Sequence, residues 1–280
     1  MSNADNRKEV APPYVLGHSD QELDRLSSQA QMIAPFTRQL FRDAGIAPGM
    51  RVLDVGSGAG DVAFLVAQLI GTTGEVIGCD TAPAAIATAS RAAELRSLGH
   101  VHFREGDPAE MAFEQPFDAV VGRYVLLYSA DRSLMLRRLA RHLRPGGVII
   151  FHEPDFSCVR SVPPAPIYDR CCQWIIEAGN LAGTPWMMAD KLHAAFVGAD
   201  LPAPTMRMET FIGGGRRVGE WLRWVVDATA SLLPAMERLG VATVGEVDLP
   251  TLSDRLFRDV AANGSTIIGR SEIGAWTRPE

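Results

Sequence analysis

The stretch VLDVGSGAGD, residues 52–61, joins an apolar run to a glycine-rich segment. Its first four residues are typical of a buried strand, and the helical periodicity that follows starts at Asp61 and ends at Ile70, before Gly71. Glycines between a strand and a helix let the backbone approach a ligand closely, beside helix N–H groups that lack partners within the helix. The stretch therefore predicts a ligand-binding turn in an α/β fold.

From residue 51 onward, short apolar runs alternate with helical patterns. This alternation predicts a mostly parallel sheet with helices on both faces, because each connection is long enough for a right-handed crossover. The expected strands lie near residues 51–55, 75–79, 101–104, 117–121 and 148–152, and the expected helices cover residues 61–70, 83–97 and 131–143.

Helical patterns also flank this core. Residues 19–22 match a capping box, and Pro35 interrupts the pattern that follows, which predicts two helices or one kinked helix. Beyond the core the expected elements are helices over 167–181 and 189–196, strands near 205–212 and 266–276, and between those strands helices over 218–239 and 249–262. An insertion of about 50 residues far exceeds a usual hairpin loop, so we expect these last helices to form a lid.

These patterns divide the chain into five expected parts. They are an N-terminal arm with helices over 1–45, a cofactor-binding core over 46–155, linker helices and a sixth strand over 156–215, a helical lid insertion over 216–263, and a last strand over 264–280.

The composition is that of an ordinary globular protein, with 47% hydrophobic and 21% charged residues among 280. A net charge of −6 repels phosphate backbones, so a nucleic-acid partner is disfavoured. No apolar run approaches the length of a membrane span and no signal-peptide pattern is seen, so we expect no membrane partner and a cytoplasmic location. The four cysteines show no C-x-x-C spacing and are expected to be free thiols.

Acidic residues stand where the second and third expected strands end. The second strand runs into GCD, residues 78–80, so Asp80 can accept bonds from both hydroxyls of a ribose, as in NAD enzymes. The third runs into REGD, residues 104–107, which places Asp107 where an adenine amino group would need an acceptor. Either acid could instead cap the helix that follows it. Together with the glycine turn, the pair favours an adenosine-containing cofactor.

The fourth strand end and the turn before strand five complete the pattern. FDAVVGRY occupies residues 117–124, and PGG occupies residues 145–147. In this order the motifs resemble class I S-adenosylmethionine-dependent methyltransferases, particularly domains similar to the ubiquinone and menaquinone biosynthesis enzymes, over residues 46–153. The resemblance implies a Rossmann-like, seven-stranded, mostly parallel sheet of order 3-2-1-4-5-7-6, with S-adenosylmethionine as cofactor and methyl transfer to a small molecule.

The resemblance also implies which residues bind the cofactor. The glycine turn would cradle the methionyl part, the acid after strand two the ribose, and the acid after strand three the adenine, while Asp54 supports the turn from beneath. The segment YVLGHS, residues 14–19, looks like the N-terminal segment of a group of bacterial methyltransferases, which implies that Tyr14 lies over the cofactor and Arg123 near its carboxylate. The expected cofactor-binding set is Tyr14, Asp54, Gly56, Ser57, Gly58, Asp80, Thr81, Gly106, Asp107, Pro108 and Arg123.

Candidate catalytic residues lie at the carboxyl ends of the strands, where open parallel sheets bind ligands. Strand five ends in HEPD, residues 152–155, where His152 can take a proton near neutral pH and Glu153 could orient it or an acceptor amine. Adjacent strand residues point to opposite faces, so the two are not expected to face one pocket equally, and no metal site is expected. A histidine bonded to the local backbone is the alternative for His152. His18 is a second candidate base.

Three functions are compatible with these motifs. The favoured one is a small-molecule methyltransferase; the others are a protein that binds the same cofactor without transferring methyl and, disfavoured by Asp107, an NAD-dependent oxidoreductase. The expected acceptor is small and partly apolar, methylated on oxygen, nitrogen or carbon, and a homodimer is left open. Aromatic residues such as Tyr124, Trp221 and Trp224 could line its pocket or belong to the core.

Overall fold

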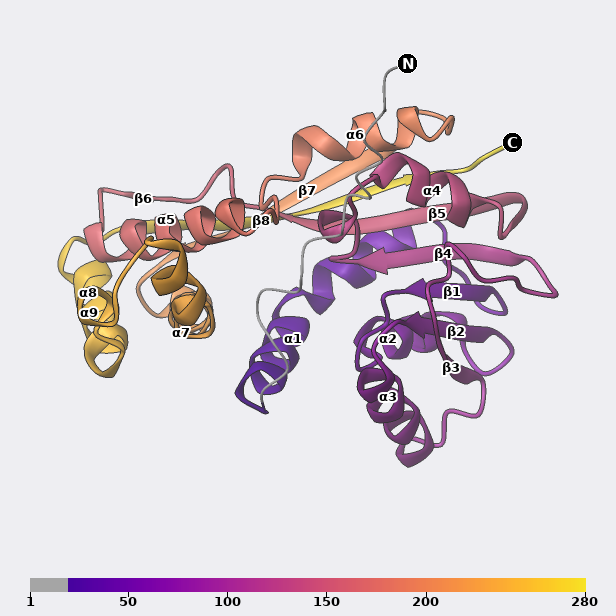
Figure 1. Cartoon of the computed structure of the whole chain (residues 1–280), viewed down its shortest axis with the longest axis horizontal. Coiled ribbons are helices and arrows are strands. Elements are labelled where there is room, and N and C mark those ends of the chain that lie inside the picture. Colours follow the sequence, from indigo (N-terminus) through magenta and orange to yellow (C-terminus); the bar gives the residue numbers. More distant parts are fainter. Residues whose placement is uncertain (1–19) are drawn as a thin grey trace, which may run out of the picture.

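A mostly parallel sheet of eight strands organises the described part of the chain (Figure 1). The computed structural model describes residues 20–280, with side chains from residue 29 onward apart from position 216. The strands are β1 (Arg51–Val55), β2 (Glu75–Asp80), β3 (Val101–Glu105), β4 (Phe117–Arg123), β5 (Leu143–Asp155), β6 (Arg160–Val162), β7 (Thr205–Gly214) and β8 (Thr266–Thr277). The first five are parallel, in the order β3-β2-β1-β4-β5, and β8 lies antiparallel beside β5.

β8 is where the sheet departs from the seven-stranded prediction. Its residues 271–277 pair with β5, and its residues 266–268 pair with β6, while β7 pairs along its other edge. Counting β8 as the seventh strand and β7 as the sixth, the order closely matches the predicted 3-2-1-4-5-7-6. The predicted number of strands is wrong by one, because three residues directly before a Pro-rich link carry no strand periodicity.

Helices cover both faces of the sheet. One face carries α1 (Asp20–Asp43), α2 (Asp61–Ile70) and α3 (Pro83–Leu95), and the other carries α4 (Arg132–Ala140) and α6 (Ala189–Gly198). Each face of the sheet has its own hydrophobic core, and Phe36, Leu40 and Phe41 of α1 are buried in the core on the face that α1 to α3 cover. α1 is a single helix that runs through Pro35. Of the two arrangements predicted from the sequence, one helix is therefore correct and two separate helices are wrong.

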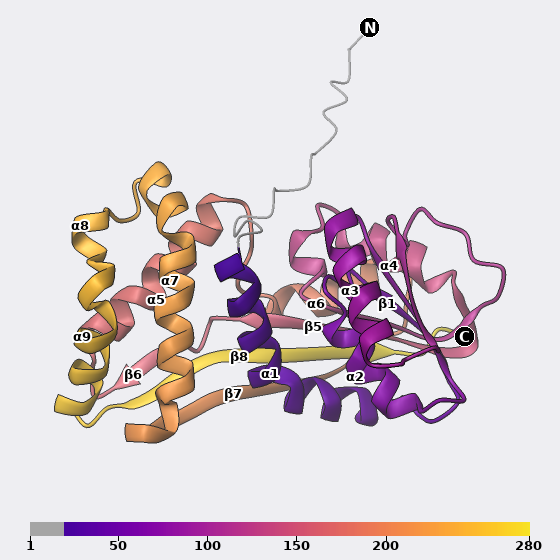
Figure 2. The same cartoon turned by 90° about the horizontal axis from the view of Figure 1, so that it is seen from below.

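Further helices gather beyond the carboxyl ends of the parallel strands (Figures 1 and 2). They are α5 (Pro166–Leu181), α7 (Gly219–Leu239), α8 (Val244–Val247) and α9 (Leu249–Ala262). α7 packs against α5, α9 and α1. Trp221 and Trp224 of α7 are buried and stack on each other with ring centroids 4.7 Å apart, so they belong to the core of this layer.

The predicted helix and strand bounds agree with the structure to within a few residues, but two helices end early. The helix predicted to reach residue 97 ends at Leu95, because Ser97 has a φ of 54° that a helix cannot contain. The helix predicted to reach residue 143 ends at Ala140, and β5 already begins at Leu143, with an irregular pairing to β4 opposite the PGG turn.

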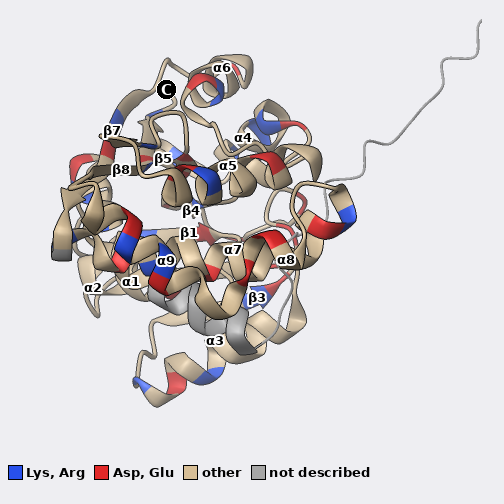
Figure 3. Ribbon diagram, turned by 90° about the vertical axis from the view of Figure 1, so that its left-hand side faces the viewer, with Lys and Arg blue, Asp and Glu red and all other residues tan. Residues whose placement is uncertain are grey.

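Acidic and basic residues are interspersed on the helices at one end of the molecule (Figure 3). Mixed charges of this kind are usual on solvated helix faces. Over residues 20–280, no helix has the length and apolar content that crossing a membrane requires.

Candidate active site

Three glycines shape the turn between β1 and α2. Gly56, Gly58 and Gly60 have φ angles of 63°, 51° and 94°, which glycine adopts without steric cost. A Cβ at Gly56 would lie 2.8 Å from Cγ2 of Val125, whereas a Cβ at Gly58 would meet nothing within 4 Å. The backbone at Gly58 therefore faces open space at the carboxyl end of β1.

Asp80, the last residue of β2, ties this turn to the neighbouring strand. Its Oδ2 accepts a hydrogen bond from the N–H of Gly58 at 2.8 Å, and its Oδ1 accepts one from the N–H of Ala82 at 2.9 Å. The side chain is only partly buried, and each carboxylate oxygen has a second lone pair. Asp80 thus caps the following turn and can still accept bonds from ligand hydroxyls.

Beneath the turn lie buried polar atoms without a protein partner. Both oxygens of Asp54 and the hydroxyl of Ser57 make no hydrogen bond of ordinary geometry within the described residues, although the backbone N–H of Ala63 is close enough to act on the Asp54 charge. Burial raises the pKa of Asp54 to about 8, although the Arg123 guanidinium and the first turn of α2 oppose this shift. Unpaired polar atoms are rare in protein interiors, so this place is suited to a polar ligand that completes the contacts.

The end of β3 carries the second predicted acid. Asp107 is exposed, and its Oδ1 accepts a backbone N–H two residues further on. Gly106 has a φ of 137°, and its N–H donates to the carbonyl of Asp80, so the two acids lie on adjacent strand ends. Pro108 is buried and Thr81 is exposed.

Comparison with known protein families identifies the family to which a chain with these strand ends belongs. Residues 46–190, just over half of the chain, match a family model described as a methyltransferase domain. The chain belongs to this family of methyltransferase domains. It is an S-adenosylmethionine-dependent enzyme that transfers a methyl group to a small molecule, which confirms the predicted reaction class and cofactor.

Similar proteins act on different acceptors. Over 175 residues the chain is 34% identical to 2-phytyl-1,4-naphthoquinone methyltransferase of Synechococcus elongatus, spanning 61% of this chain and 70% of that protein. It is 32% identical over 157 residues to aklanonic acid methyltransferase of Streptomyces sp. strain C5, spanning 56% and 70%. The YcgJ protein from Bacillus subtilis superposes with a TM-score of 0.55 at 19% identity, covering 88% and 99% of the two chains. This last likeness shows the fold alone.

His152 lies fully buried near the end of β5 of this methyltransferase. Its Nδ1 is 3.1 Å from Oγ1 of Thr37, its Nε2 is 2.8 Å from Oε2 of Glu272, and Phe36 packs edge-on against the ring. Burial lowers the pKa of His152, while the Glu272 carboxylate opposes that shift. Both ring nitrogens are thus engaged by side chains from distant elements, not by the local backbone.

Glu153 is buried and contacts another part of the molecule. Its Oε1 accepts the N–H groups of Val125 and Leu126 at 3.0 and 2.8 Å, and its Oε2 accepts that of Leu127 at 3.4 Å. Burial raises the pKa of Glu153 to about 8, and these N–H groups oppose the rise. The carboxylate fixes the start of the short helix η1 (Leu126–Tyr128), and its predicted catalytic role stays a prediction.

Four side chains form a polar cluster: the partly buried Tyr124 and the buried His152, Arg270 and Glu272. Besides His152, Glu272 accepts the hydroxyl of Tyr124 at 2.6 Å and Nε of Arg270 at 2.8 Å. Arg270 also donates to the Tyr124 hydroxyl at 2.9 Å and lies 4.4 Å over the ring of Trp224. Burial favours a neutral Glu272, but Arg270 and His152 outweigh it and lower the pKa of Glu272 to about 2.

Sequence reasoning missed Arg270 and Glu272. Both belong to β8, whose other residues are mostly apolar and buried. Charged residues are almost never fully buried unless they are paired, so two charges two positions apart within a buried strand were the available signal. The antiparallel pairing of β5 and β8 then brings them to His152.

The remaining predicted site residues are placed as follows. Arg123 ends β4, is partly buried, and its Nη1 donates to Thr37 at 3.4 Å. Tyr14 and His18 lie outside the described residues. In residues 20–280, no three His, Cys, Asp or Glu side chains are grouped to hold a metal ion.

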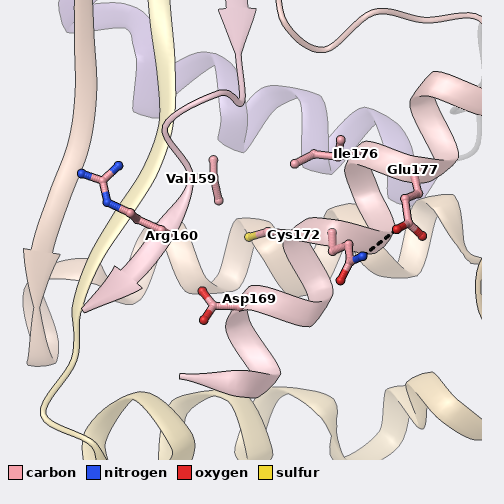
Figure 4. Close-up of a pocket in the computed structure, with 7 residues that line it drawn as sticks. Val159, Arg160, Asp169, Cys172, Ile176 and Glu177 are labelled. Atoms are coloured by element: carbon pink, nitrogen blue, oxygen red, sulfur yellow. Dashed lines mark hydrogen bonds between the residues drawn. The ribbon is translucent and has the colours of Figure 1, made fainter. Parts of the chain in front are cut away.

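A separate hollow of about 320 Å³ lies between β6 and α5 (Figure 4). Asp169 and Cys172 of α5 line it together with Arg160 of β6. Oδ2 of Asp169 accepts a bond from Ser161, and burial raises the pKa of the Cys172 thiol well above its usual range. Among the residues that the structure describes, none of the predicted cofactor or catalytic residues lines this hollow.

Proposed function

We propose that methyl transfer takes place at the carboxyl ends of β1, β2, β4 and β5, with the cofactor over the glycine turn. When bound, S-adenosylmethionine supplies a methyl group that its positively charged sulfur has already activated. The hydrogen bond between the N–H of Gly58 and the Asp80 carboxylate carries this assignment, because it sets the glycine turn beside the ribose acid. The unpaired Asp54 oxygens and the open space at Gly58 support it, since they fit a cationic ligand at close approach.

We assign the cofactor contacts by part. The methionyl part is held by Gly56, Ser57 and Gly58, with Arg123 near its carboxylate and Tyr14 over the cofactor. The ribose is held by Asp80 and Thr81 and the adenine by Gly106, Asp107 and Pro108, with Asp54 beneath the turn. These residues come from four adjacent strand ends, apart from the N-terminal Tyr14.

We assign to His152 the role of general base for an acceptor that arrives protonated. Its neutral ring and its place at the end of β5 support this role. The other contribution of the protein is alignment, which is worth up to about 7 to 11 kcal/mol when the reacting atoms are ideally placed.

The acceptor would bind between these strand ends and the helical layer of α1, α5 and α7, with the inserted helices α7 to α9 acting as the lid. Enclosure by helices on several sides suits a small, partly apolar molecule. The relatives that act on a naphthoquinone and on aklanonic acid support an acceptor of that size. The four free cysteines fit the reducing cytoplasm as its location.

A metabolite extract incubated with the purified enzyme and methyl-labelled S-adenosylmethionine tests this proposal. We expect one small-molecule fraction to gain the label, and calorimetry to show binding of S-adenosylmethionine in preference to NAD. Binding of the cofactor with no labelled product from extracts of several growth conditions would favour a protein that binds the cofactor without transferring methyl. Tight NAD binding with no response to either sulfur ligand would contradict the assigned site.

A further inference from the structure

β7 (Thr205–Gly214) lies at an edge of the sheet (Figure 2). One side of its backbone pairs with β8, and among residues 20–280 no other strand pairs with it. Nor does a backbone hydrogen bond join this strand to a helix or loop of the described chain. Its other side therefore offers a row of backbone donors and acceptors to a further strand.

The edge formed by β3 differs from the edge formed by β7. β3 has five residues and exposes His102, Arg104 and Glu105. Short length and exposed charges are usual means by which an edge strand is kept from pairing with another chain. β7 is twice as long, contains neither lysine nor proline, and exposes Met206 by 37% and Met208 by 45%. The β7 edge thus has the length and the apolar surface that pairing with another chain requires.

The two methionines extend an apolar face of the sheet. Met206 pairs with Ala275 of β8 and Met208 pairs with Ile273, and both partners are buried in the core that α4 and α6 cover. Side chains of paired residues in an antiparallel sheet lie on the same face. The core on that face therefore ends at two exposed methionines, which a second apolar strand can cover.

Arg207 and Glu209 lie on the opposite face, because neighbouring residues of a strand alternate between faces. Arg207 donates to the carboxylates of Asp43 in α1 and of Glu209. The side chains of Arg207 and Glu209 are still 36% and 47% exposed. They carry opposite charges and flank Met208 on either side along the strand.

This spacing makes the edge complementary to itself. Two copies of β7 can run antiparallel with Met208 opposite Met208. Arg207 of each copy then faces Glu209 of the other, and Met206 lies opposite Thr210 on the other face. Opposite charges in facing positions stabilise a strand pair and like charges destabilise it. A two-fold axis at Arg207 or Glu209 would instead oppose two arginines or two glutamates, so the charges favour an axis at Met208.

We propose that β7 pairs with β7 of a second copy of this chain about a two-fold axis at Met208. A symmetric dimer needs a surface that matches its own copy, and this strand has one. The dimer joins the two sheets into one, with backbone hydrogen bonds along residues 205–210. The pairing ends at the irregularity between Thr210 and Ile212, where a bulge bends the strand. The proposal does not depend on the chemistry of the active site.

Sedimentation of the purified enzyme measures the association. We expect a mass of twice 30.3 kDa. Arg207→Glu and Glu209→Arg each place like charges opposite each other, so each should raise the dissociation constant by at least about 10-fold. Arg104→Glu, which reverses an exposed charge on the β3 edge, is the matched control and should leave the mass unchanged. A monomer at every concentration, or a dimer that neither charge reversal at β7 weakens, would overturn the proposal.

A mixture of the two charge variants separates pairing across the axis from effects within one chain. Arg207→Glu also removes the contact of Arg207 with Asp43 inside its own chain. In a heterodimer of the two variants each glutamate again faces an arginine, although neither chain recovers its internal contacts. We therefore expect an equimolar mixture to associate about as strongly as the unmodified enzyme. A mixture that associates no more strongly than the separate variants would overturn the register at Met208.

Cysteine cross-linking locates the axis. In a Cys158→Ser background, which removes the one of the four cysteines that is not buried, Met208→Cys should form a covalent dimer when oxidised glutathione is added. Facing residues of antiparallel strands have Cα atoms about 4.5 to 5.5 Å apart, which suits a disulfide. Met206→Cys is the control, because its own copy would lie about 13 Å away along the strand. Cross-linking of Met206→Cys in preference to Met208→Cys would contradict the axis and leave the proposed methyl transfer untouched.

Discussion

The N–H of Gly58 and the carboxylate of Asp80 are joined by a hydrogen bond of 2.8 Å across the carboxyl ends of β1 and β2. The acid of the second strand thus holds the turn of the first, so the shape of the turn and the position of the acid that we propose to bind the ribose are one structural feature. Substitutions at either residue should therefore act on cofactor affinity, each for a reason that can be measured separately.

Asp80→Ala should weaken S-adenosylmethionine binding by about 10- to 100-fold, because it removes a charged acceptor worth about 1.5 to 3 kcal/mol. Calorimetric titration measures the change. Asp118→Ala is the control, since Asp118 is an acid of β4 that bonds to Arg51 and Arg144 at the other end of the sheet. An affinity unchanged by Asp80→Ala would mean that Asp80 only caps the turn.

Gly58→Ala should fold and yet bind the cofactor poorly. A non-glycine residue in the left-handed region costs about 1 to 2 kcal/mol, but the new methyl group would meet no protein atom within 4 Å. Gly240→Ala carries the same backbone cost, with a φ of 71° and a ψ of 24° in the left-handed region and equally open surroundings, at the end of α7. We expect similar losses of thermal stability in both variants and a loss of affinity only in Gly58→Ala. Equal affinities would place the ligand away from the turn.

Cofactor binding should release protons from Asp54. The pKa of this acid is raised to about 8, so its folded form is largely protonated at pH 7, and a cation bound above it favours the charged form. Affinity should then increase from pH 6 to pH 8. Calorimetry in buffers of different ionisation enthalpy counts the protons, and Asp54→Asn should abolish the release. Binding without proton exchange at pH 7 would contradict this coupling.

The parallel core could be predicted from the sequence because its signals are local. β1, β2 and β4 contain short apolar runs, the first three strands end in or run directly into a glycine or an acid, and the helix Asp61–Ile70 has the predicted bounds. β6 could not be predicted, since its three residues form a strand only because β8 extends past the end of β5 and offers them backbone partners.

The sequence could indicate those residues of the candidate site whose partners lie at neighbouring strand ends, but not those whose partners lie far away in the chain. Asp80 bonds to Gly58, which lies 22 residues away, and the sequence shows that both residues stand where adjacent parallel strands end. Thr37 and Glu272, by contrast, lie 115 and 120 residues from His152. No spacing in the sequence connects residues so far apart. His152 could therefore be singled out by its strand end, but its partners required the antiparallel pairing of β8 and the packing of α1.

The last prediction concerns the stability that Glu272 gives to the fold. The folded pKa of about 2 lies below the ordinary value of 4.5, so the folded state binds fewer protons at this site than the unfolded state. A lowered acid pKa contributes stability that is present above pH 4.5 and is lost as the pH falls from 4.5 toward 2. Each pH unit in this window should remove about 1.4 kcal/mol.

Glu272→Gln should accordingly be less stable than the unmodified enzyme at pH 7, on the order of 3 kcal/mol, because the ionised acid is lost and Arg270 stays buried without its charge partner. Urea denaturation at pH 7, 5 and 3.5 measures the difference. We expect the gap to be constant from pH 7 to 5 and to narrow by pH 3.5, where the unmodified enzyme has lost part of the same contribution. Glu220→Gln, at an exposed position of α7, should show no gap at any pH. A gap that stays constant down to pH 3.5 would mean that packing, and not the charge of Glu272, stabilises the cluster.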